Sequence, residues 1–588
     1  MLARKPYLIN RALKSYLFAT ILTMSVVQVN SVIDSILMGQ FLGPDALSAI
    51  TLSGPIMSLI ISFYILLAAG AALLAGKAIG ERDFDRASQI FSVSLVSLFA
   101  VGLTVSIVGC IFSKEIVGLF CKDTRLIPYL NDYMRMSIAL SFVAMMAQGM
   151  SQFTDVDGKP QEVARSMSFC VLVNIIFDIL LVAVFRIGII GSAIASSLGY
   201  LTCIIALFPH TFGRKSSYHF RFVVPKMAEI LKNNIKNGSA MVLMSLAGAA
   251  GMFIMNSLVL SSLGADGMFV MSIAGALMSI GALLASGASQ AFVAVGTMLL
   301  GQKDYKGMRF LFMRCFWLVM TVAFAVTILG VMKPDLFAVI FGADSEQLVL
   351  QAQQGVKIVI LMLIPLLVVS MMPAVYQVLG HLPLAGSLSI LFYTILLPVM
   401  WIFSKSGTPS NIWYSFPIAG WGAVALSGIT ILLFQRKCPQ TQPFTLIPTI
   451  DCTMNILELS VPCNSDSVRE AAGEINAYLS SLPDRKAYLP ESAEAVQEIL
   501  QNIVQHSGMD SSHLVDVRAY CEGDRLEFSV KDNGKAFDPT LSANQKEGLS
   551  RVTASCSKFV YKYMYGQNMV FLTWNAPQID NLTYSQSY

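Results

Sequence analysis

The chain has 588 residues, of which 55% are hydrophobic and only 13% are charged, and its formal net charge is +4. Because soluble proteins carry about 25% charged residues, this composition excludes an ordinary soluble protein. Residues 440–588 hold 18 acidic and 11 basic residues, which leaves 18 acidic and 29 basic residues in 1–439. The sequence therefore predicts a basic membrane part followed by an acidic, soluble-looking part. We expect no nucleic acid partner.

The membrane part contains about twelve apolar runs, each near the 20 residues that a spanning helix needs. The chain begins with basic residues, but the first run is too long for a signal peptide, so we interpret it as a retained helix. Strict alternation of apolar and polar residues is lacking, which excludes a membrane β-barrel. The predicted runs are 13–38, 47–76, 88–118, 128–154, 162–186, 189–210, 235–262, 267–299, 308–340, 350–379, 384–404 and 414–435.

Lysine and arginine gather in alternate loops between these runs. Basic clusters lie at the N-terminus and at 77–86, 159–165, 214–236 and 303–314, whereas the intervening loops are nearly free of them. Since cytoplasmic loops carry an excess of Lys and Arg, this pattern predicts a multi-pass protein of the bacterial inner membrane with both termini in the cytoplasm.

Four short segments of the first half recur in the same order in the second half. Such parallel repeats are typical of transporters with two lobes and a site near their interface. The sequence thus predicts two six-helix lobes, residues 1–220 and 221–437. The matching segments are Leu42–Ala46 with Leu263–Gly267, Ile79–Phe84 with Leu300–Tyr305, Gly158–Pro160 with Gly380–Pro383, and Gly191–Ser196 with Gly422–Ser427.

Two acidic residues lie inside apolar runs of the first lobe, Asp34 in the first run and Asp178 in the fifth. A carboxylate in hydrocarbon costs about 2.5–3.5 kcal/mol or more, so such residues usually face a cavity and bind or relay ions. Asn174 is one helical turn before Asp178 and shares its face. These side chains predict a site for Na⁺ or for a shared proton, although a structural hydrogen-bonded pair between helices would use the same residue types.

The combination of motifs resembles the multidrug and toxic compound extrusion (MATE) family. The residues that carry the resemblance are Asp34 followed by Gly39, Asn174 with Asp178, and the segment Gly191–Ser196. The resemblance covers roughly residues 10–435. It implies twelve helices in two lobes and the export of organic cations in exchange for H⁺ or Na⁺.

The resemblance also implies a set of site residues. The family's cation site uses an Asp, an Asn, an Asp and a Thr, which correspond here to Asp34, Asn174, Asp178 and Ser196. Serine replaces the threonine but keeps the hydroxyl, so the coupling ion stays open between H⁺ and Na⁺.

After a polar linker at 438–453, the pattern changes to that of a small cytoplasmic α/β sandwich over 454–576, with a tail at 577–588. Helical and strand periodicities alternate through this domain. The predicted strands are 454–461, 514–521, 525–531 and a pair within 558–574, and the predicted helices are 465–481 and 491–507.

Two motifs in this domain carry chemistry. Glu498, Asn502 and His506 are spaced by four residues, which places them on one helix face. About 30 residues later, Asp532 and Gly534 end a predicted strand in a turn. Either motif alone would also fit an exposed helix face or a hairpin.

In this order the two motifs resemble the GHKL ATPase fold, in particular its anti-sigma-factor serine kinase branch, over about residues 455–575. The resemblance implies that Glu498 activates a nucleophile or water, that Asn502 holds Mg²⁺, and that Asp532 binds adenine beside Gly534.

The chain departs from the GHKL pattern where ATP phosphates bind. Ala536 stands at the second glycine of the Asp-x-Gly-x-Gly motif, and the Gly-x-Gly-Leu motif is reduced to one glycine, Gly548. Glycines there let backbone amides approach phosphates. The loss of these glycines affects phosphate transfer more than adenine binding. We therefore expect the domain to bind ATP and Mg²⁺, whereas ATPase or serine/threonine kinase activity stays open.

The sequence as a whole predicts a cation-coupled exporter of organic cations, regulated by a cytoplasmic nucleotide-binding domain. Its expected partners are the substrate, the lipid bilayer and a cytoplasmic regulatory protein. An alternative is a membrane sensor whose GHKL-like domain acts as a serine kinase or sequesters a partner. A further alternative is that the protein flips a lipid precursor. The prediction of twelve rather than fourteen helices counts mildly against this alternative.

Overall fold

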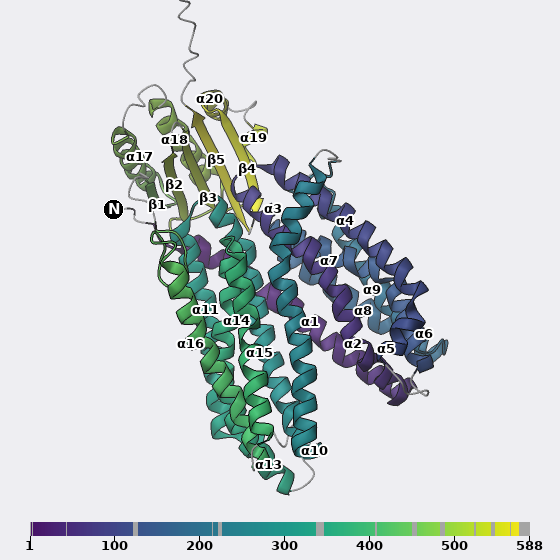
Figure 1. Ribbon diagram of the computed structural model, residues 1–588. Coiled ribbons are helices and arrows are strands. Elements are labelled where there is room, and N and C mark those ends of the chain that lie inside the picture. The colour runs from purple at the N-terminus through teal and green to yellow at the C-terminus, as the bar shows by residue number, and fades with distance from the viewer. Residues whose placement is uncertain are drawn as a thin grey trace, which may run out of the picture. The chain divides into compact units, whose positions relative to one another are not determined.

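The computed structural model describes residues 2, 4–42, 44–120, 127–213, 216–221, 226–336, 346–405, 408–449, 456–482, 489–522, 525–542, 547–564 and 566–575. The chain divides into two compact units (Figure 1). The membrane unit is Tyr16–Pro448, and the C-terminal unit combines Thr449–Tyr588 with Met1–Ser15.

The membrane unit is built of helices. Two of them run on as π-helical turns, η1 (Ile65–Ala69) and η2 (Ile179–Val184), and two 3₁₀ segments are η3 (Ile360–Met362) and η4 (Pro409–Tyr414). The α-helices are α1 (Tyr7–Leu42), α2 (Pro44–Tyr64), α3 (Gly70–Gly80), α4 (Phe84–Ile111), α5 (Ser113–Phe120), α6 (Ile127–Ala139), α7 (Ser141–Val156), α8 (Pro160–Asp178), α9 (Ile189–Thr211), α10 (Met227–Gly301), α11 (Tyr305–Met332), α13 (Glu346–Val359), α14 (Leu363–Val378), α15 (Leu382–Ser404) and α16 (Ser415–Gln435).

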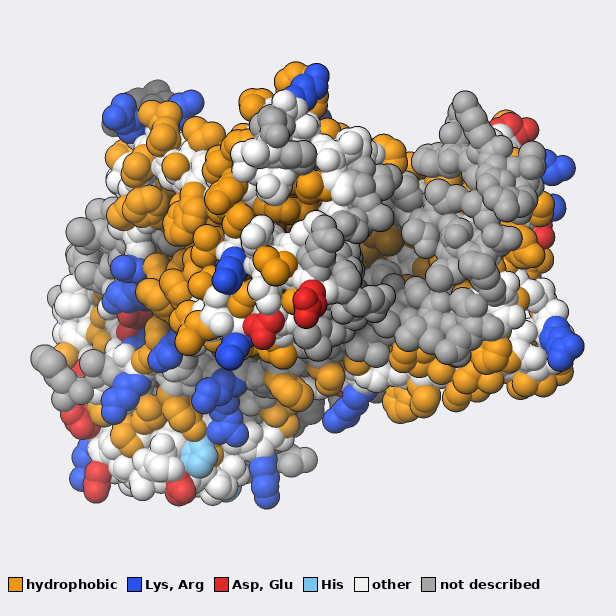
Figure 2. Space-filling view, turned by 90° about the horizontal axis from the view of Figure 1, so that it is seen from below, with side chains coloured by type: hydrophobic (Ala, Val, Ile, Leu, Met, Phe, Trp, Pro, Cys, Tyr) orange, Lys and Arg blue, Asp and Glu red, His pale blue; other side chains and the backbone are white. Residues whose placement is uncertain are grey.

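Within the described residues, nine helical stretches are long and apolar enough to cross a membrane. They correspond to nine of the twelve predicted runs; the other three are 13–38, 128–154 and 235–262. Large apolar side chains such as Phe253 and Trp317 are 73% and 61% exposed. Figure 2 shows hydrophobic side chains over much of one face of the molecule. Exposed apolar surface of this extent is expected of helices that contact lipid.

One predicted run, 128–154, is broken. Leu140 leaves the helical conformation with φ −100° and ψ 3°, which separates α6 from α7. The amide of Leu140 still bonds the Met136 carbonyl at 3.1 Å, so the break costs little backbone hydrogen bonding. Neither glycine nor proline marks this position, and for that reason the sequence did not reveal it.

The helical run α10 is 75 residues long. As a straight rod it would extend about 110 Å. Yet Gly238 near its start packs against Leu66, while Gly301 at its end packs against Gly80. Leu66 and Gly80 are only about 21 Å apart along a helix. The run must therefore turn back on itself. This agrees with the sequence analysis, which predicts two separate spans here, 235–262 and 267–299.

The predicted internal repeat has matching local backbone. Arg82 and Lys303, equivalent positions 221 residues apart, both adopt left-handed conformations with φ of 63° and 56°. The next residues, Asp83 and Asp304, each cap the following helix by accepting a backbone hydrogen bond at 2.9 Å. The same short connection therefore links helices in both halves of the chain.

The two halves also touch at equivalent positions. Gly80 of α3 and Gly301 of α10 lie so close that a Cβ atom on either would clash with the backbone of the other. Gly76 lies against the side chain of its own equivalent, Thr297. Because glycine allows such close backbone approach, α3 and the end of α10 cross about a local pseudo-two-fold axis.

The C-terminal unit contains a five-stranded antiparallel sheet in the order β1-β2-β3-β5-β4. Its elements follow the predicted order and lie within two residues of most predicted bounds. They are β1 (Ile456–Pro462), α17 (Ser465–Ser480), α18 (Leu489–His506), β2 (Leu514–Glu522), β3 (Arg525–Asp532), α19 (Pro539–Ser542), α20 (Glu547–Ser555), β4 (Lys558–Met564) and β5 (Gln567–Asn575).

One face of this sheet is apolar and the other is polar. Leu459, Val517, Val530 and Val570 pair across four strands and lie in one buried core with residues of α17, α18 and α20. Since side chains alternate between faces, the neighbouring row that begins with Ser460 points away from these helices.

We expect Phe528→Ala to destabilise the C-terminal unit by about 3–5 kcal/mol, because a large buried side chain would leave a cavity. Phe528 is 0% exposed and packs edge-to-face on Trp574, with ring centroids 6.0 Å apart. Hydrogen exchange of the β3 and β5 amides in the full chain would measure the loss. Exchange as slow as in the wild type would contradict the assignment of this core.

Candidate functional site

Asp34 and Asp178 meet in the membrane unit. Asp34 is in α1 and half-buried, whereas Asp178 is the last residue of α8 and is 0% exposed. Their carboxyl groups lie within hydrogen-bonding reach of each other. Asp178 is followed directly by η2, and π-helical turns inside helices are frequent at functional sites. The structure thus brings together the two acids that the sequence singled out.

Each acid is held by an asparagine one turn earlier on its own helix. Asn30 donates from Nδ2 to Asp34 Oδ2, and Asn174 donates from Nδ2 to Asp178 Oδ2, both at 3.0 Å. Asn174 Nδ2 also lies 3.3 Å from the Ser196 hydroxyl. The predicted set Asp34, Asn174, Asp178 and Ser196 is therefore contiguous.

Close packing of α8 against α9 brings the serines to this site. Gly199 of α9 lies against the Cys170 carbonyl, where a Cβ atom would clash. This approach places Ser196 beside Asn174 and brings Ser192 near Asp178. The small residues of α9 thus bring hydroxyl groups close to the polar residues of the neighbouring helix.

Four buried oxygens at this site have no hydrogen-bond partner among the described residues. They are the Oδ1 atoms of Asn30, Asp34, Asn174 and Asp178. Buried polar atoms are almost always hydrogen-bonded, so unsatisfied ones call for an explanation such as an ion, a proton or water. Carboxylate and amide oxygens are acceptors only, which suits a bound cation or a shared proton.

Sequence reasoning missed Asn30 and Ser192. Asn30 and Asp34 have the same four-residue spacing as Asn174 and Asp178, and this repeated spacing was a usable signal. Ser192 gave no signal, because serine is common in membrane helices. Asp155 of α7 was also missed; it is half-buried near Tyr64, whose hydroxyl accepts from Gln152 at 3.4 Å.

A second candidate site lies in the C-terminal unit. Asn502 of α18, Asp532 at the end of β3 and Asn568 at the start of β5 line one cavity together with His506 and Phe537. The cavity lies where α18 covers the ends of two paired strands, since Asp532 and Asn568 are direct partners in the β3–β5 register.

Asp532 is fixed in this cavity through one of its oxygens. Its Oδ1 accepts from the Gly534 amide and from Asn568 Nδ2, both at 2.8 Å. Within the part of the chain that the structure describes, no protein group donates a hydrogen bond to Oδ2. Burial raises the pKa of Asp532 above its ordinary value, because a charged carboxylate is less well solvated there.

Glu498 and Gly548 line a neighbouring recess between α18 and α20, together with Glu494 and Arg551. The Glu498 carboxyl lies directly against Gly548, where a Cβ atom would clash. Asn502 Nδ2 donates to Glu498 Oε1 at 3.0 Å and so connects the two recesses. All five residues predicted from the two C-terminal motifs therefore lie in one region.

The MatE family model matches the chain over residues 19–180 and 240–404. This match contains Asp34, Asn174 and Asp178, whereas Ser196 lies in the gap between its two parts. The C-terminal sheet lies outside the matched residues.

The curated relatives that match the chain include bacterial proteins named for multidrug export or multidrug resistance. The chain is 26% identical over 238 residues to "Multidrug export protein MepA" of Staphylococcus haemolyticus, which covers 39% of this chain and 52% of that protein. It is 23% identical over 214 residues to "Probable multidrug resistance protein YoeA" of Bacillus subtilis, with coverage of 36% and 46%. The matches thus span about half the length of these relatives.

Solved structures share the fold of the membrane unit. A MOP superfamily transporter from Pyrococcus furiosus superposes with a TM-score of 0.66 at 19% identity, over 74% of this chain and 96% of that chain. An outward-facing multidrug resistance MATE family transporter gives the same TM-score and identity, over 74% and 98%. At this identity the likeness concerns the fold alone.

Proposed function

The chain belongs to the MatE family of multi-pass membrane transporters, and on that basis we propose that it exports organic cations in exchange for H⁺ or Na⁺. We further propose the family arrangement of twelve spanning helices in two six-helix lobes, in the bacterial inner membrane. Both termini face the cytoplasm in this proposal, as the alternating basic loops indicate.

The observation that carries the proposal is the set of four buried oxygens around Asp34 and Asp178 for which the described residues provide no hydrogen-bond partner. Two ionised carboxylates in contact repel each other strongly where the dielectric is low. A cation between them removes this repulsion and satisfies the free oxygens. Occupancy of the site therefore favours α1 and α8 close together, and loss of the cation favours their separation.

This dependence supplies a coupling mechanism. Asp34 and Asp178 hold the H⁺ or Na⁺, while Asn30, Asn174 and Ser196 orient the carboxyl groups and supply neutral oxygens. Because the ion changes how α1 packs on α8, its binding shifts the first lobe between two arrangements. One arrangement takes up the substrate, and the other releases it on the opposite side of the membrane.

We expect the protein to protect a pump-deficient bacterial host against cationic drugs and to drive efflux of a cationic dye. The dissipation of an ion gradient should stop this efflux, since the transporter has no other energy source in this proposal. An uncoupler and Na⁺-free buffer would distinguish the two ions. No protection and no efflux across a broad cationic panel, at confirmed expression, would contradict the proposal.

For the C-terminal unit we propose a GHKL-like regulatory domain that binds ATP with Mg²⁺. The supporting observation is that Asn502, Asp532 and Glu498 lie together beside one cavity region. In this proposal Asp532 accepts from the adenine amino group, Asn502 is the Mg²⁺ ligand, and Gly548 lies near the phosphates. Glu498 would polarise a water or hydroxyl if the domain transfers phosphate.

A further inference from the structure

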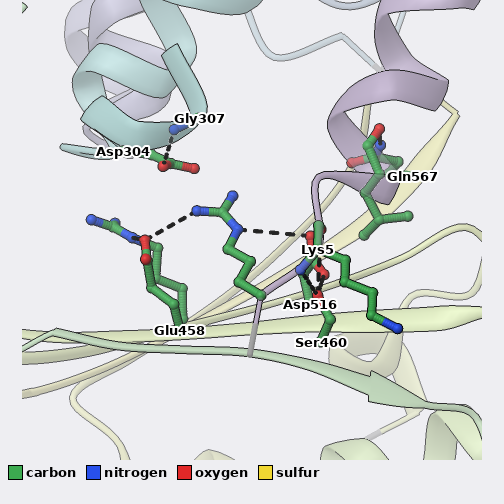
Figure 3. Close-up of polar contacts among 10 residues, drawn as sticks. Lys5, Asp304, Gly307, Glu458, Ser460, Asp516 and Gln567 are labelled. Atoms are coloured by element: carbon green, nitrogen blue, oxygen red, sulfur yellow. Dashed lines mark hydrogen bonds and ion pairs between the residues drawn. The ribbon is translucent and has the colours of Figure 1, made fainter. Parts of the chain in front are cut away.

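The first residues of the chain are bound to the C-terminal sheet. We name residues 2 and 4–8 the strap. The Ser460 amide donates to the Leu2 carbonyl at 2.9 Å, and the Lys5 amide donates to Ser460 Oγ at 2.8 Å. Figure 3 shows Lys5 beside Ser460 and Asp516 on the sheet. Since β1 is an edge strand, the strap also covers backbone that would otherwise be exposed.

An ionic contact holds the strap in place. Arg4 Nη1 lies 3.2 Å from Glu458 Oε1, and Arg4 Nε lies 4.0 Å from Asp516 Oδ2. These three side chains are only 5–12% exposed, so solvent and salt screen the contact less than a surface pair. Leu2 adds an apolar contact with the buried core of the sheet. The strap is therefore an integral part of the C-terminal unit.

The strap continues directly into the first membrane helix. Gln567 Nε2 of β5 donates to the Leu8 carbonyl at 2.7 Å, in the first turn of α1. From there α1 runs without a proline to Leu42 and carries Asn30 and Asp34. Leu8 and Asp34 are about 39 Å apart along this helix. One end of α1 is thus held by the C-terminal unit, and its other half bears the ion site.

The same strand also forms a wall of the C-terminal cavity. Gln567 is followed by Asn568, whose side chain bonds Asp532 Oδ1 at 2.8 Å and the Lys535 carbonyl at 3.0 Å. Successive strand residues point to opposite faces, so β5 contacts the cavity on one face and α1 on the other. A ligand that shifts the β5 backbone at Asn568 would also shift its neighbour Gln567, the residue that holds α1.

We propose that the strap is a regulatory linkage through which a nucleotide in the C-terminal cavity controls ion-coupled transport by way of α1. This inference rests on the nucleotide site proposed above. Each step of the linkage is a direct contact or a continuous helix. The cavity wall includes Asn568 of β5, the adjacent Gln567 bonds the first turn of α1, and α1 carries Asp34. The class of ligand is a purine nucleotide, because Asp532 offers an acceptor to an exocyclic amino group.

Arg4→Ala is the variant that tests the linkage. It removes the ionic contact that anchors the strap to the sheet, while Glu458 keeps Arg518, at 3.4 Å, and Asp516 keeps Ser460, at 2.6 Å. Arg11→Ala is the matched control, since the one polar contact of Arg11 within the described residues is an exposed one of 3.4 Å with Tyr7. Both variants remove one arginine from the same terminal segment, and neither residue lines the cavity.

The experiment uses purified full-length protein in proteoliposomes, with Mg-ATP and a non-hydrolysable analogue as probes. Three quantities are measured: nucleotide affinity, the rate of substrate transport, and hydrogen exchange of the amides in residues 7–15. In the wild type and in Arg11→Ala, nucleotide should change the transport rate by about fivefold, the lower end of ordinary allosteric coupling. It should also change exchange in residues 7–15.

In Arg4→Ala, nucleotide affinity and transport without nucleotide should match the wild type, while both nucleotide responses disappear. A full response in Arg4→Ala would overturn the linkage, as would a wild type that binds nucleotide without any change in transport. Absence of nucleotide binding to the wild type would instead overturn the nucleotide site, and the linkage with it. The affinity measurement separates these failures.

Discussion

In the Asp178→Asn variant we expect ion-coupled efflux to fall to the background of cells without the transporter, while the protein still folds and reaches the membrane. Asparagine has the shape of aspartate and keeps an oxygen for the Asn174 amide, which Asp178 now accepts at 3.0 Å. It cannot take up a proton at neutral pH or balance the charge of Na⁺.

The size of the effect follows from the contacts that are lost. The variant loses the contact between a charged carboxylate and the cation. Contacts to a charged group contribute about 1.5–3 kcal/mol each, so ion binding should weaken roughly 10- to 100-fold. Asp178 is 0% exposed, so solvent cannot replace the missing ligand. Dye efflux and drug tolerance at matched expression measure this loss.

Asp85→Asn is a suitable control for Asp178→Asn. It removes a carboxylate from the same lobe, but Asp85 is 70% exposed and, among the residues that the structure describes, its ion pair is with the exposed Arg221. Surface pairs of this kind contribute about 0–1 kcal/mol, so transport should persist. Normal efflux in Asp178→Asn would refute the assignment of the ion site.

The second large effect concerns nucleotide binding, which Asp532→Asn should weaken roughly 10- to 100-fold in the full chain. The substituted amide can keep the bonds that Oδ1 accepts from Gly534 and Asn568, both at 2.8 Å. Its nitrogen would replace Oδ2, however, and present a donor to the adenine amino group, which is also a donor. Titration with a fluorescent ATP analogue gives the affinity.

Affinity should also depend on pH in the wild type. Burial raises the pKa of Asp532, so its carboxylate takes up a proton at a higher pH than an exposed aspartate does. Nucleotide binding should therefore weaken as the pH falls toward that raised pKa, and recover as the pH rises. Asp510→Asn, in an exposed loop of the same unit, should change neither the affinity nor its pH profile.

If Asp532→Asn binds nucleotide as tightly as the wild type, the GHKL-like assignment of the cavity is wrong. The burial of the Asp532 carboxyl group at this cavity would then need another explanation.

Local patterns explain how much of these sites could be predicted from the sequence. Asp34 and Asp178 were identified because acids in apolar runs are rare, and Asn174 because four residues make one helical turn. Asn568 could not be identified in this way. It reaches Asp532 only through the β3–β5 register, which pairs residues 36 positions apart.

The strap escaped prediction for a related reason. Arg4 and Lys5 were interpreted as topology signals, which basic residues near a membrane helix often are. Their contacts with Glu458 and Ser460 join residues 454 and 455 positions apart, so no local spacing indicates them. By contrast, the strands of the C-terminal unit and its helices α17 and α18 follow from alternation and helical periodicity, and the structure confirms them. The short helices α19 and α20 were not predicted.

The contact between Gly80 and Gly301 has an evolutionary consequence. If the two halves of the chain descend from a duplicated gene, these glycines were once a single residue. In a homodimer of six-helix halves, that residue would have met its own copy across the symmetry axis, as residues on such an axis do. One substitution there would have introduced two side chains at once. After such a fusion each position could mutate separately, and in this chain both positions hold glycine.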